Sequence, residues 1–175
     1  MAPRTTFIAG FLAAFALLAA AGGGFLLYDR VGASSANAAP VPQFRAPAGE
    51  YGPQKVVYHV STKGTWRDRE AEAWRLIAVL NNHINAVEPE PLALQVVFQG
   101  DGIDALRRAK TNPTLAAAFD NLRKRGVKLQ VCANTLEAYK LSLETLYNVR
   151  EADLVQAAVA EFVRLQQQGY SYIKF

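Results

Sequence analysis

Cys132 is the residue whose type and position could most directly do chemistry. It is the chain's single cysteine, and it ends the apolar run VKLQVC at residues 127–132, which predicts a short strand. The next helix is predicted to begin two or three residues later, capped by Asn134 or Thr135, so the sulfur could lie near backbone N–H groups and the positive end of a helix dipole. That environment favours the nucleophilic thiolate. The alternative is a buried cysteine that packs at the strand tip as a small apolar side chain.

A second candidate is the turn QGDG at residues 99–102, which follows the apolar run LALQVVF. Ligands of open parallel sheets bind beyond the carboxyl ends of the strands, and residues 61–64, 99–102 and 132–135 form three such ends. The backbone donors of Gly100 and Gly102 could therefore hold an anion. Neither a GxGxxG nor a GxxxxGK[ST] pattern is present, so a phosphate site has weak support and a tight turn is the simpler interpretation.

The two histidines are weaker candidates for a functional role than Cys132. His59 lies in the apolar run VVYHV and is predicted to be a core or interface residue, while His83 lies on a helix with Asn82 and Asn85, whose shared face could hydrogen-bond a loop or a partner. One cysteine and two separated histidines give a metal centre little support, and we expect no cofactor. No order of nucleophile, base and acid can be argued from the sequence, so a hydrolase has little support as well.

Strand and helix patterns alternate around these residues. Short β-branched and aromatic runs predict strands, and apolar positions at helical spacing predict helices between them. The predicted strands cover residues 55–60, 92–98, 127–132 and 170–175, and the predicted helices cover 67–87, 104–125 with a break at Asn112-Pro113, 134–147 and 153–168. Strands separated by helices imply parallel pairing through right-handed crossovers, so the predicted class is α/β in one layered domain.

The N-terminus has the pattern of an export signal. Arg4 precedes an uncharged apolar run at residues 7–27, and Ala36-Asn37-Ala38 has the small-x-small form of a cleavage site. The run is also long enough for a retained anchor, so residues 1–38 are predicted to be a signal peptide or a membrane anchor. Residues 39–53 are predicted to be a Pro- and Ala-rich linker, and residues 54–175 a domain in the periplasm or otherwise outside the cytosol.

Composition agrees with this division. The chain is 51% hydrophobic, slightly more than the roughly 45–50% of ordinary soluble domains, and the N-terminal run accounts for the excess. Its formal net charge of +4 is modest and its basic residues alternate with acidic ones, so we expect no nucleic-acid partner. Contact with a membrane is expected only through the N-terminal segment.

Several segments together resemble the DsrE/DsrF-like family of small sulfur-relay proteins. They are KVVYHVS, LNNHINA, LQVVFQGDGIDAL, LRKRGVKLQVCANTL and AVAEFVRLQQQGYSYIKF, which lie between residues 55 and 175. The resemblance implies a three-layer α/β/α fold with a mostly parallel five-stranded sheet, and assembly into homo- or hetero-oligomers, often trimers or hexamers. It also implies that Cys132, in the CANTL motif, takes up sulfur as a persulfide and passes it on.

Two functional hypotheses follow. The first is a persulfide carrier or sulfurtransferase-like protein that acts outside the cytosol on sulfur donors and acceptor thiols or proteins. In it Cys132 is the nucleophile, and Asn134, Thr135, Gly100 and Gly102 help to hold the sulfur anion. The second is a non-catalytic oligomeric binding or scaffolding module in which the cysteine is only packed. Exposed aromatic side chains would then anchor the interface, with Tyr147, Tyr170 and Tyr172 as the candidates.

Overall fold

The computed structural model describes residues 45–61 and 69–175. The predicted signal or anchor segment at residues 1–38 lies outside this range, as do residues 39–44 of the predicted linker and residues 62–68, which include most of the predicted strand end at 61–64. Residues 45–53 contain a turn at 48–51 and no helix or strand. Within the described part of the chain, no helix has the length and apolar character needed to cross a membrane.

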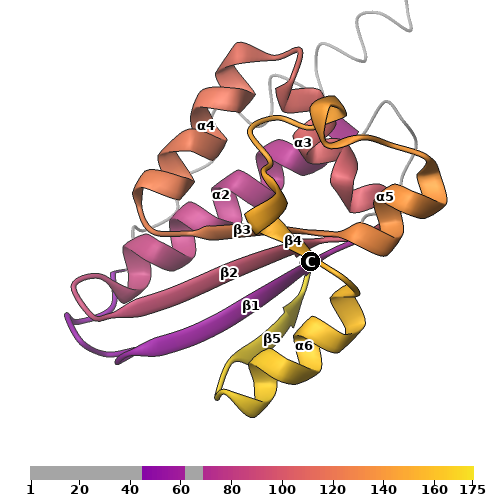
Figure 1. Ribbon diagram of the computed structural model, residues 1–175. Helices are drawn as coiled ribbons and strands as arrows, with labels where there is room; N and C mark the ends of the chain where they lie inside the picture. The colour runs from indigo at the N-terminus through magenta and orange to yellow at the C-terminus, as the bar shows by residue number, and fades with distance from the viewer. Residues whose placement is uncertain (1–44, 62–68) are drawn as a thin grey trace, which may run out of the picture. The chain divides into compact units, whose positions relative to one another are not determined.

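Five parallel strands form one sheet in the order β4-β3-β2-β1-β5 (Figure 1). The strands are β1 (Gln54–Val60), β2 (Leu92–Phe98), β3 (Lys128–Cys132), β4 (Leu154–Val155) and β5 (Ser171–Lys174). Val60 lies opposite Phe98 and Phe98 opposite Val131, so the carboxyl ends of the three central strands meet at one edge. The predicted α/β class and the parallel pairing are confirmed.

Helices cover both faces of the sheet, which is consistent with three α/β/α layers. Figure 1 shows α2, α3 and α4 on one face and α6 on the other. The helices are α2 (Arg69–Val87), α3 (Asp104–Ala109), α4 (Pro113–Lys124), α5 (Ala133–Tyr139) and α6 (Ala158–Gln167). Single 3-10 turns lie at Gly100–Ile103, Leu143–Thr145 and Glu151–Asp153.

The two faces of the sheet bury very different amounts of apolar surface. Side chains alternate along a strand, so Val56, Tyr58 and Val60 of β1 point into a large apolar cluster with α2, α3 and α4. Val57 points the other way, into a small cluster with Val97, Cys132, Ala158, Phe162 and Leu165. We call this second side the α6 face. It carries the cysteine, and its apolar covering by described residues comes mainly from one ten-residue helix.

The break in the second predicted helix is confirmed. Asn112 has extended backbone angles, and its side chain accepts a hydrogen bond from the Leu115 N–H, while Pro113 is the first helical residue. Proline lacks only an N–H that would be unpaired at that position. Gly126, at φ 84°, then ends the turn after α4, as a left-handed position favours glycine.

Three predictions near the cysteine are wrong. Cys132 itself, not Asn134 or Thr135, is the N-cap of α5, and α5 ends at Lys140, at φ 52°, instead of continuing to residue 147. The last helix begins at Ala158 and not at residue 153, because Asp153 accepts the Arg150 N–H and closes a 3-10 turn. Strand β4 was missing from the prediction, since two residues are too few to show an alternating pattern.

Candidate functional site

Cys132 ends β3 with its side chain on the α6 face. The residue is only 5% exposed, and it packs in the small cluster that α6 covers. Side chains alternate between the two faces along a strand, so Cys132 lies on the same face as Lys128 and Gln130. The thiol therefore lies at a carboxyl strand end, as predicted, but beneath a layer of protein.

The layer that covers the sulfur is the connection between β4 and α6, residues 156–158, which we call the thiol strap. The Ala158 N–H donates to Cys132 Sγ at 3.4 Å, and Sγ lies 3.9 Å from the Gln156 carbonyl oxygen. The Asn134 N–H donates to the same carbonyl at 3.1 Å. The strap thus supplies one donor to the sulfur and is itself held by the segment that follows the cysteine.

This donor is the functional group that the sequence prediction missed. Ala158 is the first residue of α6, so its N–H belongs to the set that a helix leaves without internal partners. An N–H aimed at sulfur stabilises negative charge there, and the helix dipole acts in the same direction. The sequence prediction started the last helix five residues too early, at residue 153, so Ala158 was not recognised as the first helical residue, whose N–H has no partner within the helix.

The other predicted site residues are brought close together, but the backbone N–H groups of Gly100, Gly102 and Asn134 are occupied within the chain. The Gly100 N–H donates to Thr135 Oγ1 at 3.1 Å, which ties the turn after β2 to α5. The Gly102 N–H donates to the Gln99 carbonyl at 3.0 Å. Asn134 is exposed, and its backbone N–H holds the strap. In this conformation these residues brace the surroundings of the cysteine.

Gly102 also permits a close approach between two strand ends. A Cβ at this position would lie 2.2 Å from the Val60 carbonyl oxygen, a distance that real Cβ atoms do not show. The requirement is one of space, because Gly102 is not among the residues with positive φ. Glycine here lets the turn after β2 pack directly on the end of β1.

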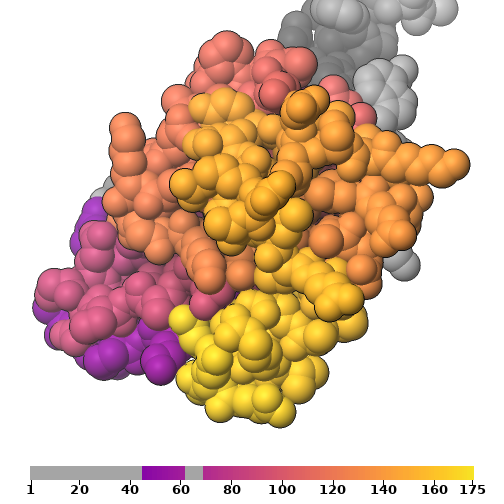
Figure 2. Space-filling model, viewed as in Figure 1, coloured from indigo at the N-terminus to yellow at the C-terminus, as the bar shows by residue number. Residues whose placement is uncertain are grey.

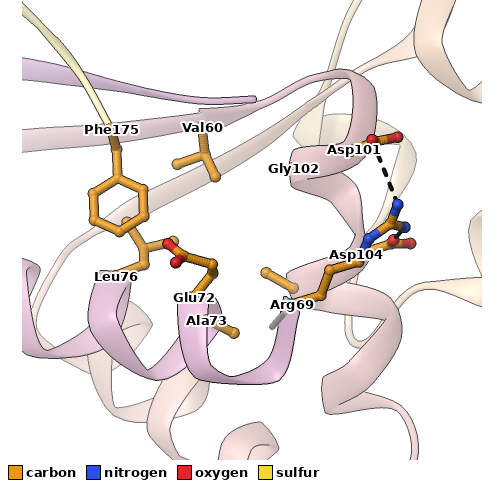
Figure 3. Close-up of a pocket in the computed structure, with 10 residues that line it drawn as sticks. Val60, Arg69, Glu72, Ala73, Leu76, Asp101, Gly102, Asp104 and Phe175 are labelled. Atoms are coloured by element: carbon orange, nitrogen blue, oxygen red, sulfur yellow. Dashed lines mark hydrogen bonds and ion pairs between the residues drawn. The ribbon is translucent and has the colours of Figure 1, made fainter. Parts of the chain in front are cut away.

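A second feature at the carboxyl edge of the sheet is a cluster of charged side chains (Figure 3). Arg69 pairs with Asp104 and lies 3.5 Å from Asp101, whose other oxygen accepts the Tyr139 hydroxyl at 3.1 Å. The cavity beside Arg69 has a volume of about 10 Å³. That space holds about one water molecule. The charged cluster is therefore better suited to joining α2 to the turn after β2 than to binding a substrate.

His59 lies on the α6 face near the end of β1, where its ring is 4.5 Å from that of Phe162. Its Nδ1 is 2.6 Å from the Tyr172 hydroxyl, whereas Nε2 is buried without a partner among the described residues. Burial and the positive charge of Lys174 lower the pKa of His59 to about 4. The residue is therefore neutral in the folded protein at physiological pH.

His83 is also held within the fold. Its Nδ1 is 2.9 Å from the Tyr58 hydroxyl and its Nε2 is 2.8 Å from Gln54 Oε1, and burial lowers its pKa. The predicted polar stripe beside it is partly used as well, since Asn85 accepts a hydrogen bond from Arg125. Within the described ranges no three His, Cys, Asp or Glu side chains gather as metal ligands would.

A groove of about 380 Å³ lies beside the thiol strap. Lys128 and Gln130 of β3, Val155 of β4 and Glu161 and Arg164 of α6 line it, together with Gln156 and Ala157 of the strap. We call it the β4 groove. It places charged and amide side chains next to the segment that covers the cysteine.

Comparison with known proteins agrees with this architecture. The family model of the DsrE/DsrF-like family matches residues 54–175, and the chain belongs to that family. The resemblance in the sequence is thereby confirmed. Members of this family are broadly associated with sulfur relay.

One solved structure extends the comparison. It is that of the protein of unknown function MTH1491 from Methanobacterium thermoautotrophicum, to which this chain is similar with 26% identity and a TM-score of 0.55. The match covers 70% of this chain and 99% of the other. No curated protein matches the chain.

Proposed function

We propose that this protein is a persulfide carrier or sulfurtransferase-like protein that works through Cys132. The observation that carries the proposal is the Ala158 N–H aimed at Cys132 Sγ, 3.4 Å away, at the carboxyl end of β3 in a DsrE/DsrF-like domain. A donor at this position stabilises a thiolate and, after reaction, a persulfide anion.

The chemistry needs one cysteine and no external oxidant. The Cys132 thiolate attacks the outer sulfur of a donor persulfide R–S–SH, so that the Sγ–S bond forms while the donor's S–S bond breaks. The donor leaves as the thiolate R–S⁻ with the electron pair of the broken bond. An acceptor thiolate then attacks the outer sulfur on Cys132, forms its own persulfide and regenerates the Cys132 thiolate.

Access to the sulfur requires movement of the thiol strap. Cys132 is 5% exposed, and residues 156–158 lie against its sulfur. The Gln156 carbonyl of the strap accepts a backbone hydrogen bond from Asn134, and Gln156 itself is exposed. Opening this segment would expose the thiol without disturbing the pairing of the three central strands.

The test is intact-mass spectrometry after incubation with glutathione persulfide, polysulfide or thiosulfate. We expect a gain of about 32 Da, one sulfur atom, which returns to the starting mass when an acceptor thiol is added. The Cys132→Ser variant is the matched control and should gain nothing. Absence of the adduct with every donor would overturn the proposal.

A second candidate is a non-catalytic oligomeric module, and the burial of Cys132 within the small apolar cluster favours it. Maleimide labelling separates the two. A packed cysteine should react only when the protein unfolds, whereas strap opening gives steady labelling of native protein. Labelling of native protein much faster than global unfolding would rule out this second candidate.

We also propose that the domain forms a homo-oligomer, a trimer or hexamer, through α6 and β5. Of the proposed anchors, Tyr172 is 41% exposed, while Tyr147 and Tyr170 are half-buried, and the Tyr147 hydroxyl donates to Asp120. The support comes more from Val159 and Val163 of α6, which are 64% and 55% exposed. Light scattering of the soluble domain should report an oligomer that Val163→Glu dissociates, and a monomer at all concentrations would refute this.

We further propose that the protein acts outside the cytosol, with residues 1–38 as a cleaved signal or a retained anchor. The support is the sequence pattern of the N-terminus alone. The intact mass of the protein recovered from its native compartment distinguishes cleavage from retention. Recovery of the full-length chain from the cytosolic fraction would contradict export.

A further inference from the structure

The β4 groove shares the α6 face of the sheet with Cys132. Lys128, Gln130 and Cys132 follow one another along β3 at two-residue steps, so their side chains lie on the same face. Figure 2 shows the segment before α6, in orange, beside α6 and β5, in yellow, on one side of the molecule. The groove and the buried cysteine thus lie on the same face of the sheet, separated by the thiol strap.

The floor of the groove contains a hydrogen-bond acceptor without a donor. Gln130 is 4% exposed; its Nε2 donates to Glu161 Oε1 at 3.3 Å, while its Oε1 is buried and has no partner among the described residues. Gln95 lies opposite Lys128 in the pairing of β2 with β3, and its Oε1 is also buried without a hydrogen-bond partner among the described residues. Buried carbonyl groups are almost always paired in native proteins. Of these two oxygens only that of Gln130 belongs to a residue that lines the groove, and it indicates a ligand that brings an N–H group.

The rim of the groove is cationic. Lys128 is exposed and forms no ion pair within the part of the chain that the structure describes. Arg164 forms a two-pronged pair with Glu161, at 2.7 and 2.5 Å, which neutralises the one carboxylate that lines the groove. The charge of Lys128 also helps to lower the pKa of Glu161, so these three side chains leave the groove with a net charge of one positive unit, and a carboxylate is its simplest complement.

The distance to the cysteine fits a short peptide. Cys132 follows Lys128 by four residue steps along β3, which corresponds to about 13 Å along the strand. A tripeptide bound at its carboxylate by the flexible lysine side chain can carry a sulfur across this distance. It would meet the strap at Gln156 and Ala157, which line the groove, and the Gln156 carbonyl lies against Cys132 Sγ.

We infer that the β4 groove binds a small peptide thiol of the glutathione type, with Lys128 at its carboxylate and Gln130 Oε1 accepting from its amide N–H. The substrate class rests on the proposed sulfur chemistry of Cys132. The groove thereby selects peptide persulfides over inorganic polysulfide and delivers the sulfur at the thiol strap.

Binding is tested with S-methylglutathione, which has no transferable sulfur, by calorimetry or NMR titration of the full domain and of Cys132→Ser. We expect saturable binding to both proteins, with chemical shifts that change at the groove. Lys128→Gln should weaken binding about fivefold, the upper range for one exposed ion pair. Lys124→Gln is the matched control, because Lys124 is an exposed lysine on α4, on the other face of the sheet.

Two further probes address the recognising groups. The diethyl ester of S-methylglutathione lacks the carboxylates and should bind wild type and Lys128→Gln equally weakly. Gln130→Leu should lose binding about tenfold, because it removes the acceptor oxygen. The substitution also removes the Nε2 donor to Glu161, so folding of the variant is checked by circular dichroism. The exposed Lys128→Gln variant gives a second test that does not depend on a buried substitution, and unchanged binding by a folded Gln130→Leu protein would overturn the role of Gln130.

The outcomes separate this inference from the proposed function. Binding of S-methylglutathione without any persulfide on Cys132 supports the groove and refutes the sulfur chemistry. A persulfide formed from polysulfide, without binding of S-methylglutathione at millimolar concentration, refutes the groove and supports the chemistry. Equal binding of the free acid and the diethyl ester, or no effect of Lys128→Gln, also overturns the inference.

Discussion

His59 should make the folded protein less stable as the pH falls below about 6.5. Burial, and then the charge of Lys174, lower its pKa in the folded protein from 6.5 to about 4. Between these two pH values the unfolded chain binds a proton that the folded protein does not. The free energy of unfolding therefore decreases with decreasing pH across this window and levels off below about pH 4.

The expected loss follows from the two pKa values. One proton of difference gives a slope that approaches about 1.4 kcal/mol per pH unit, so the contribution of His59 between pH 7.5 and pH 5 is about 2 kcal/mol. This range lies above the region where carboxylates dominate. The pKa of Glu161 is lowered by the hydrogen bond from Arg164, so it costs stability mainly below its ordinary value of 4.5.

The assay is urea unfolding, followed by circular dichroism, of the wild type and of His59→Phe at several pH values from 7.5 to 5. Phenylalanine keeps a ring against Phe162 and removes the titrating group, at the cost of a pH-independent loss of the bond to Tyr172. His83 is present in both proteins, so its contribution cancels in the difference. We expect the stability advantage of the wild type to shrink by about 2 kcal/mol across the range. A difference that stays constant with pH would refute the assigned burial of His59.

Three further substitutions test the local packing around the sheet. Gly102→Ala should lower the free energy of unfolding by about 3 kcal/mol in urea titrations, because the new Cβ meets the Val60 carbonyl, and an unchanged stability would contradict the close approach. Asn112→Ala should cost about 1 kcal/mol in thermal unfolding, because it removes the cap that accepts the Leu115 N–H, while Asn112→Ser should retain most of it without placing a second carboxylate beside Glu70. Arg125→Ala should cost about 1–2 kcal/mol, since the guanidinium bonds three side-chain oxygens on and just after α2, and a cost that is unchanged at high salt would argue against its ionic part.

Much of the fold was predictable because its signals are local. The run LALQVVF was predicted as residues 92–98, which are the bounds of β2, and Asn112-Pro113 marks the start of a helix by its own chemistry. Strand β4 was not predicted, because its two residues are recognised as a strand only through their pairing with Val131 and Cys132. The early end of α5 at Lys140 was equally hidden, since a left-handed lysine is set by the surrounding packing and not by propensity.

The candidate site also combines features that the sequence indicates with contacts that only the folded structure shows. The sequence pointed to Cys132 and to the segments that surround it, because a single cysteine at a strand end is visible without coordinates. It assigned the donor to the residues after the cysteine, whereas the nearest N–H to the sulfur comes from Ala158, which is 26 residues further along the chain. No local pattern encodes a contact over that separation.

The sequence by itself determined the alternation of four of the five strands with helices, the parallel α/β class, the family and the residue to test, since each depends on neighbours in the chain. Only the tertiary structure decided which face of the sheet Cys132 occupies, that residues 156–158 cover it, and that Lys128 and the unpaired amide oxygen of Gln130 belong to the adjoining groove. The physical reason is that burial and hydrogen-bond pairing are properties of groups brought together from distant strands. They exist only after the sheet has formed and α6 has packed on it.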